Sequence, residues 1–410
     1  MGRDVAVIGG GYAGMAAGVA LAERGVRVTV FESGPVPGGR ARRVVSQGNE
    51  LDNGQHIFVG AYTELFRLMH VVGAAQGALL RMPLQIRYAD GFTFSAGLLG
   101  LLTARLSLRE RLETMRFMAA LKRMKFRVEP DISVQQFLDA HGQRGRMRHY
   151  VWAPLCVSAL NTPLDQASTN AFLAALRDTL AGGPGASDLV LPRKDLSRLF
   201  PEPAAEYIRK RGGEVRCGTT IRELESLDSR HVIVAVGPHQ LKALLPDAPE
   251  FDYQPIYTCY LQYPEATRLG FPMIGMADGL IQWVFDRGAL LGEKGRLACV
   301  ISAQGDHQQL SQDELADRCD GELRKVIPNL GRVSWTRVIA EKRATIACTP
   351  GLKRPDVKRN GVILAGDYTD PEYPPTIEAA VRSGVRAARL CMIPGEGGTH
   401  GDTEAAHLGR

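Results

Sequence analysis

Residues 4–32, DVAVIGGGYAGMAAGVALAERGVRVTVFE, contain the pattern that decides the fold. Two continuous apolar runs, 4–8 and 26–31, flank an alanine-rich stretch at 12–23, and this order predicts two parallel strands joined by a helix. Three glycines with GxGxxG spacing separate the first strand from the helix. The stretch therefore predicts the βαβ unit of a Rossmann-type nucleotide-binding domain.

Each glycine of this turn has a physical role. Gly9 makes the tight turn, Gly11 lets the backbone approach a pyrophosphate, and Gly14 lets the helix pack against the strand. The start of the helix presents free N–H groups to phosphate, and Glu32 ends the second strand where a carboxylate can bond a ribose hydroxyl. The residues expected at the nucleotide here are Gly9, Gly11, Tyr12, Ala13, Gly14, Glu32 and Ser33.

Two further motifs indicate which dinucleotide binds. Residues 37–40, PGGR, follow the ribose carboxylate, and residues 364–367, LAGD, form a strand that ends in Gly-Asp. Residues 374–378, PPTIE, then open a helix whose N-terminus would stabilise negative charge on a reduced ring. Both elements resemble the flavin amine oxidase and phytoene desaturase superfamily, which implies FAD. The contacts that this resemblance implies are Gly38, Gly39, Arg40, Gly366, Asp367, Thr376 and Ile377.

Four other segments are more specific. They are DNGQH at 52–56, WAPLCVSALNTP at 152–163, LPRKDLS at 191–197 and ACTPG at 347–351. Together they resemble the hydroxysqualene dehydroxylases, the squalene-associated FAD-dependent desaturase-like enzymes of hopanoid biosynthesis, from about Asp4 to Arg389. The resemblance places Gly54, Gln55 and His56 near the isoalloxazine ring. We also expect Val215, in a strand at 214–217, beside the nucleotide.

The resemblance implies a reaction on an apolar isoprenoid. Hydroxysqualene would lose its hydroxyl and receive hydride from reduced FAD, giving squalene. An ionised allylic carbon can accept hydride if the protein positions it and excludes water. The electron donor is unknown, and a separate reductase or free reduced flavin would serve. Only one GxGxxG is present, so we expect no resident NADPH.

Departure of the hydroxyl needs an acid or a strong hydrogen-bond donor. His56 is the first candidate, and the alternative is a histidine bonded to backbone or FAD. Asn161 and Tyr260 are weaker candidates, because the first could cap a turn and the second could be a packed strand residue. Cys156 is expected to pack a helix, and Cys348 lies outside the closing flavin motif, which favours non-covalent FAD.

Three other functions stay open. A carotenoid or phytoene-type desaturase would use the same fold and cofactor with electrons flowing the other way. An amine oxidase would need a lysine near the flavin and an aromatic cage. The substrate strands supply Tyr257, Tyr260, Tyr263 and Trp283 but no obvious lysine. A non-catalytic FAD-binding scaffold is the third alternative.

The predicted fold class is α/β, with a Rossmann-type, flavin amine oxidase-like FAD domain and an inserted α+β substrate domain. We assign 1–80, 190–250 and 345–393 to the FAD domain. The substrate domain takes 81–189, which is mostly helical from 131 to 180, and 251–344. That second part has strands at 257–263, 280–285, 297–302 and 333–339 and a helix at 313–327. The polar tail at 394–410 is expected to be disordered.

A basic segment follows an apolar run at 94–102. Along the predicted helix at 106–127, the residues Leu108, Leu112, Met115, Met118 and Ala119 share one face, and arginines line the others. Segment 94–127 therefore predicts either an interfacial helix on anionic lipid or a cap over a substrate channel.

The bulk composition excludes several classes. A net charge of +6 over 410 residues does not predict nucleic-acid binding. Seven cysteines without a CxxC pair predict neither disulfides nor zinc, and no metal site is expected. No secretion signal and no apolar run of about 20 residues is seen. We expect a cytoplasmic protein, either soluble or peripheral on the inner membrane face.

Overall fold

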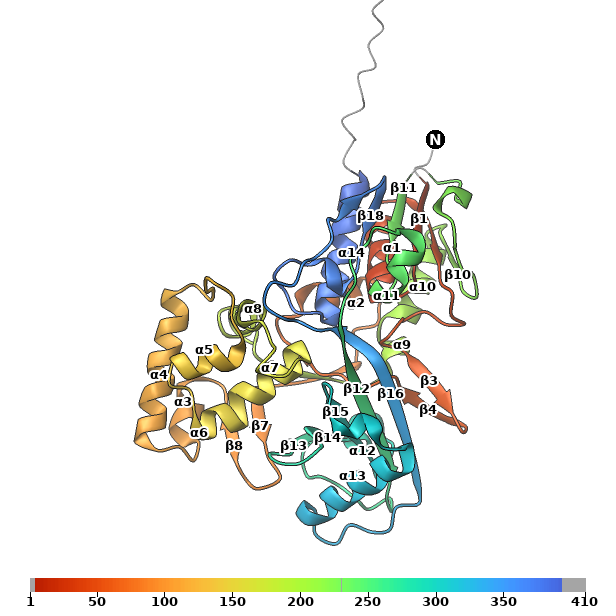
Figure 1. Ribbon diagram of the computed structural model, residues 1–410. Coiled ribbons are helices and arrows are strands. Elements are labelled where there is room, and N and C mark those ends of the chain that lie inside the picture. Colours follow the sequence, from red (N-terminus) through yellow and green to blue (C-terminus); the bar gives the residue numbers. More distant parts are fainter. Residues whose placement is uncertain (1–3, 230, 393–410) are drawn as a thin grey trace, which may run out of the picture.

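The computed structural model describes residues 4–229 and 231–392. Its larger sheet has six strands in the order β10-β2-β1-β11-β18-β17. These strands are β1 (Asp4–Ile8), β2 (Arg27–Phe31), β10 (Glu214–Arg216), β11 (His231–Val234), β17 (Lys358–Arg359) and β18 (Val362–Leu364). Five of these strands run parallel, as the glycine-turn pattern predicts: β10, β2, β1, β11 and β18. This α/β layer occupies the upper part of Figure 1.

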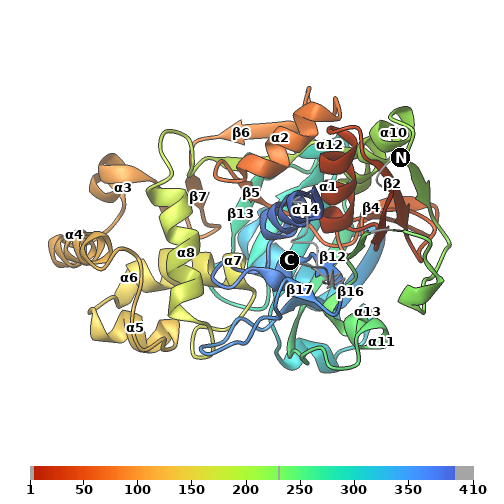
Figure 2. The ribbon, with the colours of Figure 1, turned by 90° about the horizontal axis from the view of Figure 1, so that it is seen from above.

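Helices cover this sheet. α1 (Tyr12–Ala22) is buried along its whole length, since the sheet, α14 (Ile377–Met392) and α10 (Pro201–Lys210) all pack against it. The remaining helices of this half are α2 (Thr63–Val71), α9 (Leu196–Leu199) and α11 (Pro238–Leu244). α1 and α14 lie side by side in both Figure 1 and Figure 2, which brings the two ends of the chain together.

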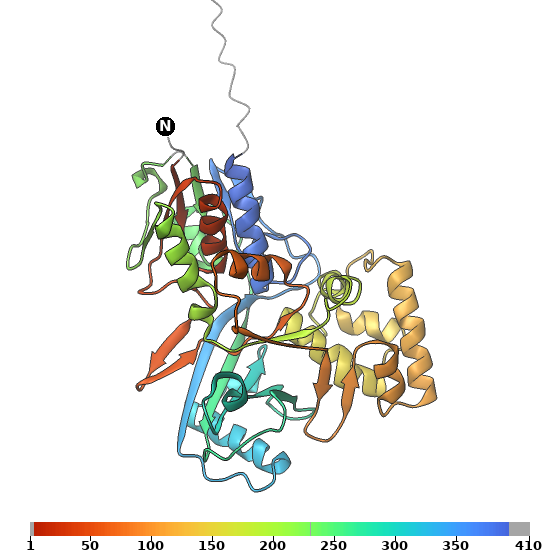
Figure 3. The same cartoon turned by 180° about the vertical axis from the view of Figure 1, so that it is seen from behind.

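The second half contains an antiparallel sheet of five strands in the order β13-β14-β15-β12-β16. The strands are β12 (Tyr253–Gln262), β13 (Met273–Gly275), β14 (Trp283–Asp286), β15 (Arg296–Ser302) and β16 (Trp335–Ile346). Helices α12 (Arg287–Leu291) and α13 (Gln312–Val326) accompany this sheet. β12 and β16 run from this sheet up to the layer of the six-stranded sheet (Figure 3).

A helical group lies beside this sheet in Figure 1. It consists of α3 (Gly97–Thr103), α4 (Leu108–Arg123), α5 (Val134–Ala140), α6 (Gly145–Met147), α7 (Ala153–Leu160) and α8 (Thr169–Leu180), with a π-helical turn at Arg148–Trp152. Short hairpins and connecting strands complete the chain: β3 (Arg43–Ser46), β4 (Asn49–Asp52), β5 (Phe58–Val59), β6 (Leu79–Met82), β7 (Gln85–Arg87), β8 (Thr93–Ser95) and β9 (Leu189–Pro192). Three short 3-10 turns lie at Leu224–Ser226, Asp306–Gln309 and Asp367–Thr369.

Two strand predictions need correction. The strand expected at 280–285 begins only at Trp283, because the N–H groups of Leu280 and Ile281 bond the Glu322 carboxylate on α13 instead of a neighbouring strand. The strand expected at 333–339 begins at Trp335 and extends to Ile346, since it continues along β12 toward the six-stranded sheet. The boundaries given for the two domains stay predictions, and the predicted disordered tail lies outside the described residues.

Candidate functional site

The glycine turn leaves no room for a side chain at Gly9 or Gly14. Gly9 has φ of +106°, and a Cβ there would lie 2.5 Å from the Ala235 carbonyl oxygen. A Cβ on Gly14 would lie 1.9 Å from the Gly9 oxygen, so this glycine serves helix–strand packing. At Gly11 a Cβ would lie 3.8 Å from the Gly39 Cα, which is an ordinary van der Waals distance. No side chain caps the N-terminus of α1, and its first N–H groups are available to an anion in the cavity.

The Glu32 carboxylate stands at the end of β2, at the edge of the same cavity. It accepts hydrogen bonds from the N–H groups of Gly10, at 2.7 Å, and Gly34, at 2.6 Å. These backbone donors hold it in one orientation. Glu32 and Ser33 both line the cavity, as a role at the ribose requires.

The PGGR motif and the C-terminal LAGD motif meet at an ion pair. Gly38 and Gly39 have positive φ angles and turn the chain against Gly11. Arg40 Nη2 then lies 2.6 Å from Asp367 Oδ1, and Arg40 Nη1 donates to the Ala344 oxygen. Residues 327 positions apart thereby form one wall of the cavity.

Helix α14 begins at this wall. Thr376 caps it, because Thr376 Oγ1 accepts the N–H of Ala379 at 3.1 Å. The buried Glu378 carboxylate turns the other way and accepts the N–H groups of Glu64 and Leu65 at the start of α2. The N-terminus of α14 therefore faces the cavity at Thr376 and Ile377, while Glu378 fixes its position.

The hydrogen bond of His56 does not support a role as a proton donor to the substrate. Its Nδ1 lies 3.1 Å from the Gly54 oxygen, which can only accept, so Nδ1 carries a proton. Burial lowers the pKa of His56 below its ordinary value, which favours the neutral imidazole. The remaining nitrogen, Nε2, is then an acceptor. His56 lines the cavity, but a neutral ring whose Nε2 only accepts does not fit the acid role predicted for it.

Asn161 also has its polar atoms occupied. It adopts a left-handed conformation at the end of α7, with φ of 48°. Its Nδ2 lies within 3.3 Å of three oxygens, those of Gln254, Pro255 and the Thr345 side chain, and its Oδ1 accepts the Ala303 N–H. Asn161 lines the cavity, but it serves to join α7 to β12 and β16.

Val215 and Tyr260 do not reach the cavity, and their predicted roles are corrected. Val215 packs in the core beneath α10, because β10 is the outermost strand of its sheet on this side. Tyr260 is fully buried on β12, and its hydroxyl donates to the Asp52 carbonyl oxygen at 2.9 Å. Both are packing residues of their strands.

The cavity has a volume of about 1090 Å³. This lies at the upper end of the range for small-molecule and cofactor sites, about 300–1,000 Å³. A glycine cradle, a ribose-side carboxylate and two helix N-termini fit a dinucleotide, so the donor set agrees with FAD. The predicted residues that line it are Gly9, Gly11, Tyr12, Ala13, Glu32, Ser33, Gly38, Gly39, Arg40, Gly54, Gln55, His56, Asn161, Gly366, Asp367, Thr376 and Ile377.

The apolar part of the cavity lining was not predicted. It combines residues that follow His56 with residues of the five-stranded sheet: Ile57, Phe58, Tyr62, Ile256, Trp283, Phe285 and Val300. We call these seven residues the apolar wall. Trp283 and Phe285 are two apart on β14 and share a face, and Trp283 pairs with Val300 on β15. The aromatic residues at 283 and 285 were the available signal, but nothing local shows which face of the strand turns inward.

The cysteines do not line this cavity. Cys156 is fully buried in the helical core, as expected for a packing residue, and burial raises the pKa of its thiol. Burial likewise raises the pKa of Cys348 to about 11. Neither thiol is poised to form a thiolate.

Known proteins resemble the whole chain. Hydroxysqualene dehydroxylases of Rhodopseudomonas palustris and Zymomonas mobilis are 28% and 27% identical; the matches cover 96% and 94% of this chain and 100% and 98% of theirs. A zeta-carotene desaturase of Arabidopsis thaliana is 23% identical, over 96% of this chain and 86% of its own.

Solved structures share the fold. An oxidoreductase from Methanosarcina mazei superposes with a TM-score of 0.74 at 16% identity, covering 95% of this chain and 100% of its own. Cyclohexylamine oxidase from Brevibacterium oxydans superposes with a TM-score of 0.71 at 17% identity, and the match covers 95% of this chain and 99% of its own. The family model described as flavin containing amine oxidoreductase matches residues 12–392. The chain belongs to this family and is an FAD-dependent oxidoreductase.

Proposed function

We propose that this enzyme reductively dehydroxylates hydroxysqualene to squalene, a step of hopanoid formation. A C–O bond breaks, a C–H bond forms at the same carbon, and a proton converts the departing hydroxide to water. Hydride donation is the chemistry that reduced FAD supplies when it is bound. An external two-electron reductant, either free reduced flavin or a separate reductase, must restore the reduced cofactor after each turnover.

The apolar wall is the observation that carries this proposal. It gives an isoprenoid chain a water-poor surface that is continuous with the residues expected around the ring, Gly54 to His56 and Thr376. Burial of such a chain is favourable by about 25 cal/mol per Å² of apolar surface. The relatives named hydroxysqualene dehydroxylase agree with a substrate of this kind.

The wall also suits a reaction through an electron-poor carbon. Aromatic faces, here Trp283 and Phe285, attract positive charge. Exclusion of water protects an ionised carbon from hydrolysis. The cavity lining includes the hydroxyl groups of Tyr62, Ser158 and Ser302; Ser158 Oγ lies 3.0 Å from Trp283 Nε1, and burial raises the pKa of Tyr62. They can therefore act as hydrogen-bond donors.

The cavity lining disfavours an amine oxidase. Among the described residues that line it there is no lysine. Of the four aromatic residues considered for a cage, only Trp283 reaches the cavity. The desaturase alternative shares the fold and cofactor, and the zeta-carotene desaturase relatives keep it as the second candidate.

The deciding experiment is anaerobic. Enzyme reduced with light and a deazaflavin is mixed with hydroxysqualene, flavin absorbance near 450 nm is followed, and squalene is quantified by mass spectrometry. We expect one squalene per flavin reoxidised. Reoxidation without squalene, or no reoxidation, would contradict the proposal. Desaturation of squalene or a carotene by the oxidised enzyme would instead support the second candidate.

We further propose that helix α4 docks on anionic lipid. Its buried face consists of Thr114, Phe117 and Leu121. The predicted apolar face points outward: Leu108 is 82% exposed, and Leu112, Met115 and Ala119 are exposed as well, while Met118 is half-buried against the core. Segment 97–127 has eight Lys and Arg against two Glu. In the part of the chain that the structure describes, no helix meets the length and hydropathy needed to cross a bilayer.

Apolar side chains between arginines are typical of a helix lying in the headgroup region. Each basic residue near an anionic surface contributes about 1 kcal/mol. The triple variant Arg109→Glu, Arg116→Glu, Arg123→Glu should lose cosedimentation with phosphatidylglycerol vesicles, and neutral phosphatidylcholine vesicles should bind the wild type weakly.

A matched charge control is available on exposed positions elsewhere. The triple variant Arg318→Glu, Lys325→Glu, Lys353→Glu makes the same change in net charge away from α4. It should keep most of its vesicle binding. Equal loss in both triple variants, or no loss in the α4 variant, would contradict docking through α4.

A further inference from the structure

A buried arginine joins the substrate sheet to the DNGQH loop. Arg287, the first residue of α12, is 1% exposed. Its Nε and Nη2 donate to the Glu293 carboxylate at 2.8 and 2.6 Å, and its Nη1 lies 3.3 Å from Asp52 Oδ2 and 3.0 Å from Gln55 Oε1. The Glu293 carboxylate alone can balance the charge of Arg287, and Asp52 supplies a second carboxylate, so the bond to Gln55 is not needed for charge balance.

This bond sets the direction of the Gln55 amide. A guanidinium group only donates, so the amide atom that meets it is the oxygen. The amide nitrogen, Nε2, then points away from Arg287. Gln55 lines the cavity and is 9% exposed, and among the described residues no acceptor for Nε2 is found. The arrangement leaves two N–H donors of Gln55 at the cavity wall.

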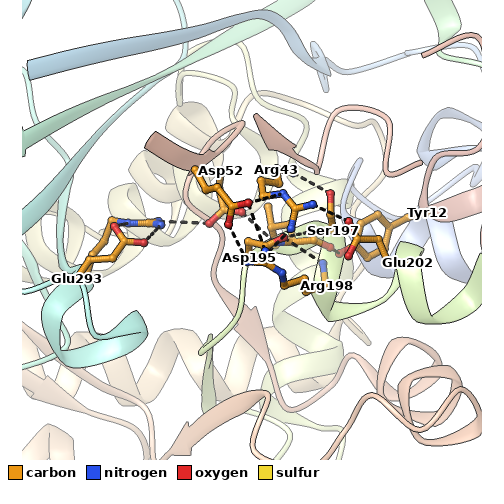
Figure 4. A network of polar contacts seen from close by, with 11 residues as sticks. Tyr12, Arg43, Asp52, Asp195, Ser197, Arg198, Glu202 and Glu293 are labelled. Carbon is orange, nitrogen blue, oxygen red and sulfur yellow. Dashed lines mark hydrogen bonds and ion pairs between the residues drawn. The ribbon is translucent and has the colours of Figure 1, made fainter. Parts of the chain in front are cut away.

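The loop itself is held from several sides. Asp52 Oδ1 accepts the Leu196 N–H at 2.8 Å, and the Leu196 oxygen accepts the Tyr12 hydroxyl at 2.9 Å. Figure 4 shows Asp52 between Glu293 on one side and Asp195 and Tyr12 on the other. These contacts tie the loop to α1, to the start of α9 and to α12. Gln55 therefore presents its donors from a fixed backbone.

We propose that Gln55 donates a hydrogen bond to an uncharged oxygen of a bound ligand, and that Arg287 is the positioning residue that aims it. The oxygen belongs either to the flavin ring or to the alcohol of the substrate. The second case rests on the function proposed above. A donor on the alcohol oxygen stabilises the charge that develops there as the C–O bond lengthens.

Two substitutions at Gln55 remove the donors and leave Arg287 in place. Gln55→Met keeps the length of the side chain without polar atoms. Gln55→Glu, studied at about pH 8, keeps an acceptor for Arg287 and places only acceptors at the cavity wall. Both variants should bind FAD and fold, because the contacts of Asp52 and Leu196 persist.

If the flavin ring is the acceptor, the difference is visible without substrate. Gln55→Glu and Gln55→Met should then shift the visible absorption and circular dichroism of bound FAD and change its midpoint potential. This arm does not depend on the reaction, so it can succeed even if hydroxysqualene is not a substrate.

If the alcohol is the acceptor, the FAD spectra stay as in the wild type. Titration of the oxidised enzyme with hydroxysqualene, followed by flavin difference absorbance, should show about ten-fold weaker binding in both variants, the range expected for one lost hydrogen bond. Squalene, which lacks the hydroxyl, should bind all three proteins equally. Failure of the wild type to bind hydroxysqualene would count against the proposed function alone. Wild-type behaviour of both variants in both arms would overturn the role of Gln55.

The role of Arg287 is tested by coupling. Arg287→Lys keeps the charge but not the fixed donor geometry. Whichever property changes in Gln55→Met, the FAD spectrum and midpoint potential or the affinity for hydroxysqualene, should change in the same direction in Arg287→Lys, by a smaller factor. Combined with Gln55→Met, it should add nothing further to that readout. An equal additional change in the Gln55→Met background would show that Arg287 acts without Gln55 and would refute its positioning role.

Discussion

Neutralising Asp52 should change how stability depends on pH. Burial raises the pKa of this carboxyl from 3.8 to about 6, and the nearby Arg287 offsets only part of that effect. The folded state therefore binds the Asp52 proton more tightly than the unfolded chain does. This contribution to stability is complete below about pH 4 and is lost as pH rises through 6. At 1.36 kcal/mol for each pKa unit, the ionised carboxylate costs about 3 kcal/mol at pH 8.

Asp52→Asn has no such proton. Its free energy of unfolding, measured relative to the wild type, should rise by about 1 kcal/mol between pH 5 and pH 7 and stay level above pH 7. One pH-independent loss is expected, because a single amide oxygen cannot accept from both Leu196 and Arg287. The test therefore lies in how the difference in free energy of unfolding between Asp52→Asn and the wild type changes with pH. The constant part of that difference does not test the pKa.

Urea unfolding of the FAD-loaded proteins at pH 5, 6, 7 and 8, followed by tryptophan fluorescence, measures this difference. Asp188→Asn, at a partly exposed carboxylate that pairs with Arg81, is the control and should run parallel to the wild type. Parallel curves for Asp52→Asn as well would show that Asp52 is ionised throughout this range. The attraction of Arg287 would then outweigh the cost of burial, and the reasoning would be refuted.

Three other predictions concern the cavity and its supports. Gly14→Ala should purify with little FAD, because its Cβ would lie 1.9 Å from the Gly9 oxygen. The ratio of absorbance at 450 and 280 nm measures the bound FAD, and Gly321→Ala, where a Cβ meets open space, should keep the wild-type ratio. Glu378→Gln should lower the free energy of unfolding by about 1–3 kcal/mol, since one carboxylate oxygen loses its acceptor role; an unchanged urea midpoint would contradict this. His56→Gln should leave the shape of the pH–rate profile unchanged, and loss of a limb between pH 6 and 8 would restore His56 as an acid.

The nucleotide end of the cavity was largely predictable. Gly9, Gly11, Glu32 and Arg40 were located from motifs in which the functional residues are neighbours in sequence, and all four line the cavity. Such motifs encode backbone conformation and helix starts within a few residues. Membership in a flavoprotein family followed from them, and the family match confirmed it.

The substrate end was not predictable in the same way. Trp283 reaches the cavity while Tyr260 does not, although both were noted as strand aromatics. Which face of a strand turns inward depends on register against its neighbours, and a shift of one residue reverses it. His56 lines the cavity, but its hydrogen bond to Gly54 decides which ring nitrogen carries the proton, and the sequence does not show that bond.

The sequence alone determined that this protein folds around a dinucleotide, because glycine conformation and helix termini are local properties of the chain. The resemblance of the PGGR and LAGD motifs to the flavin amine oxidases implied that the dinucleotide is FAD. The tertiary structure alone decided what surrounds the reacting end. Gln55 and Arg287 are 232 positions apart, and they meet only because α12 follows β14 onto the DNGQH loop. Contacts of that kind depend on how whole layers pack, and no local pattern specifies them.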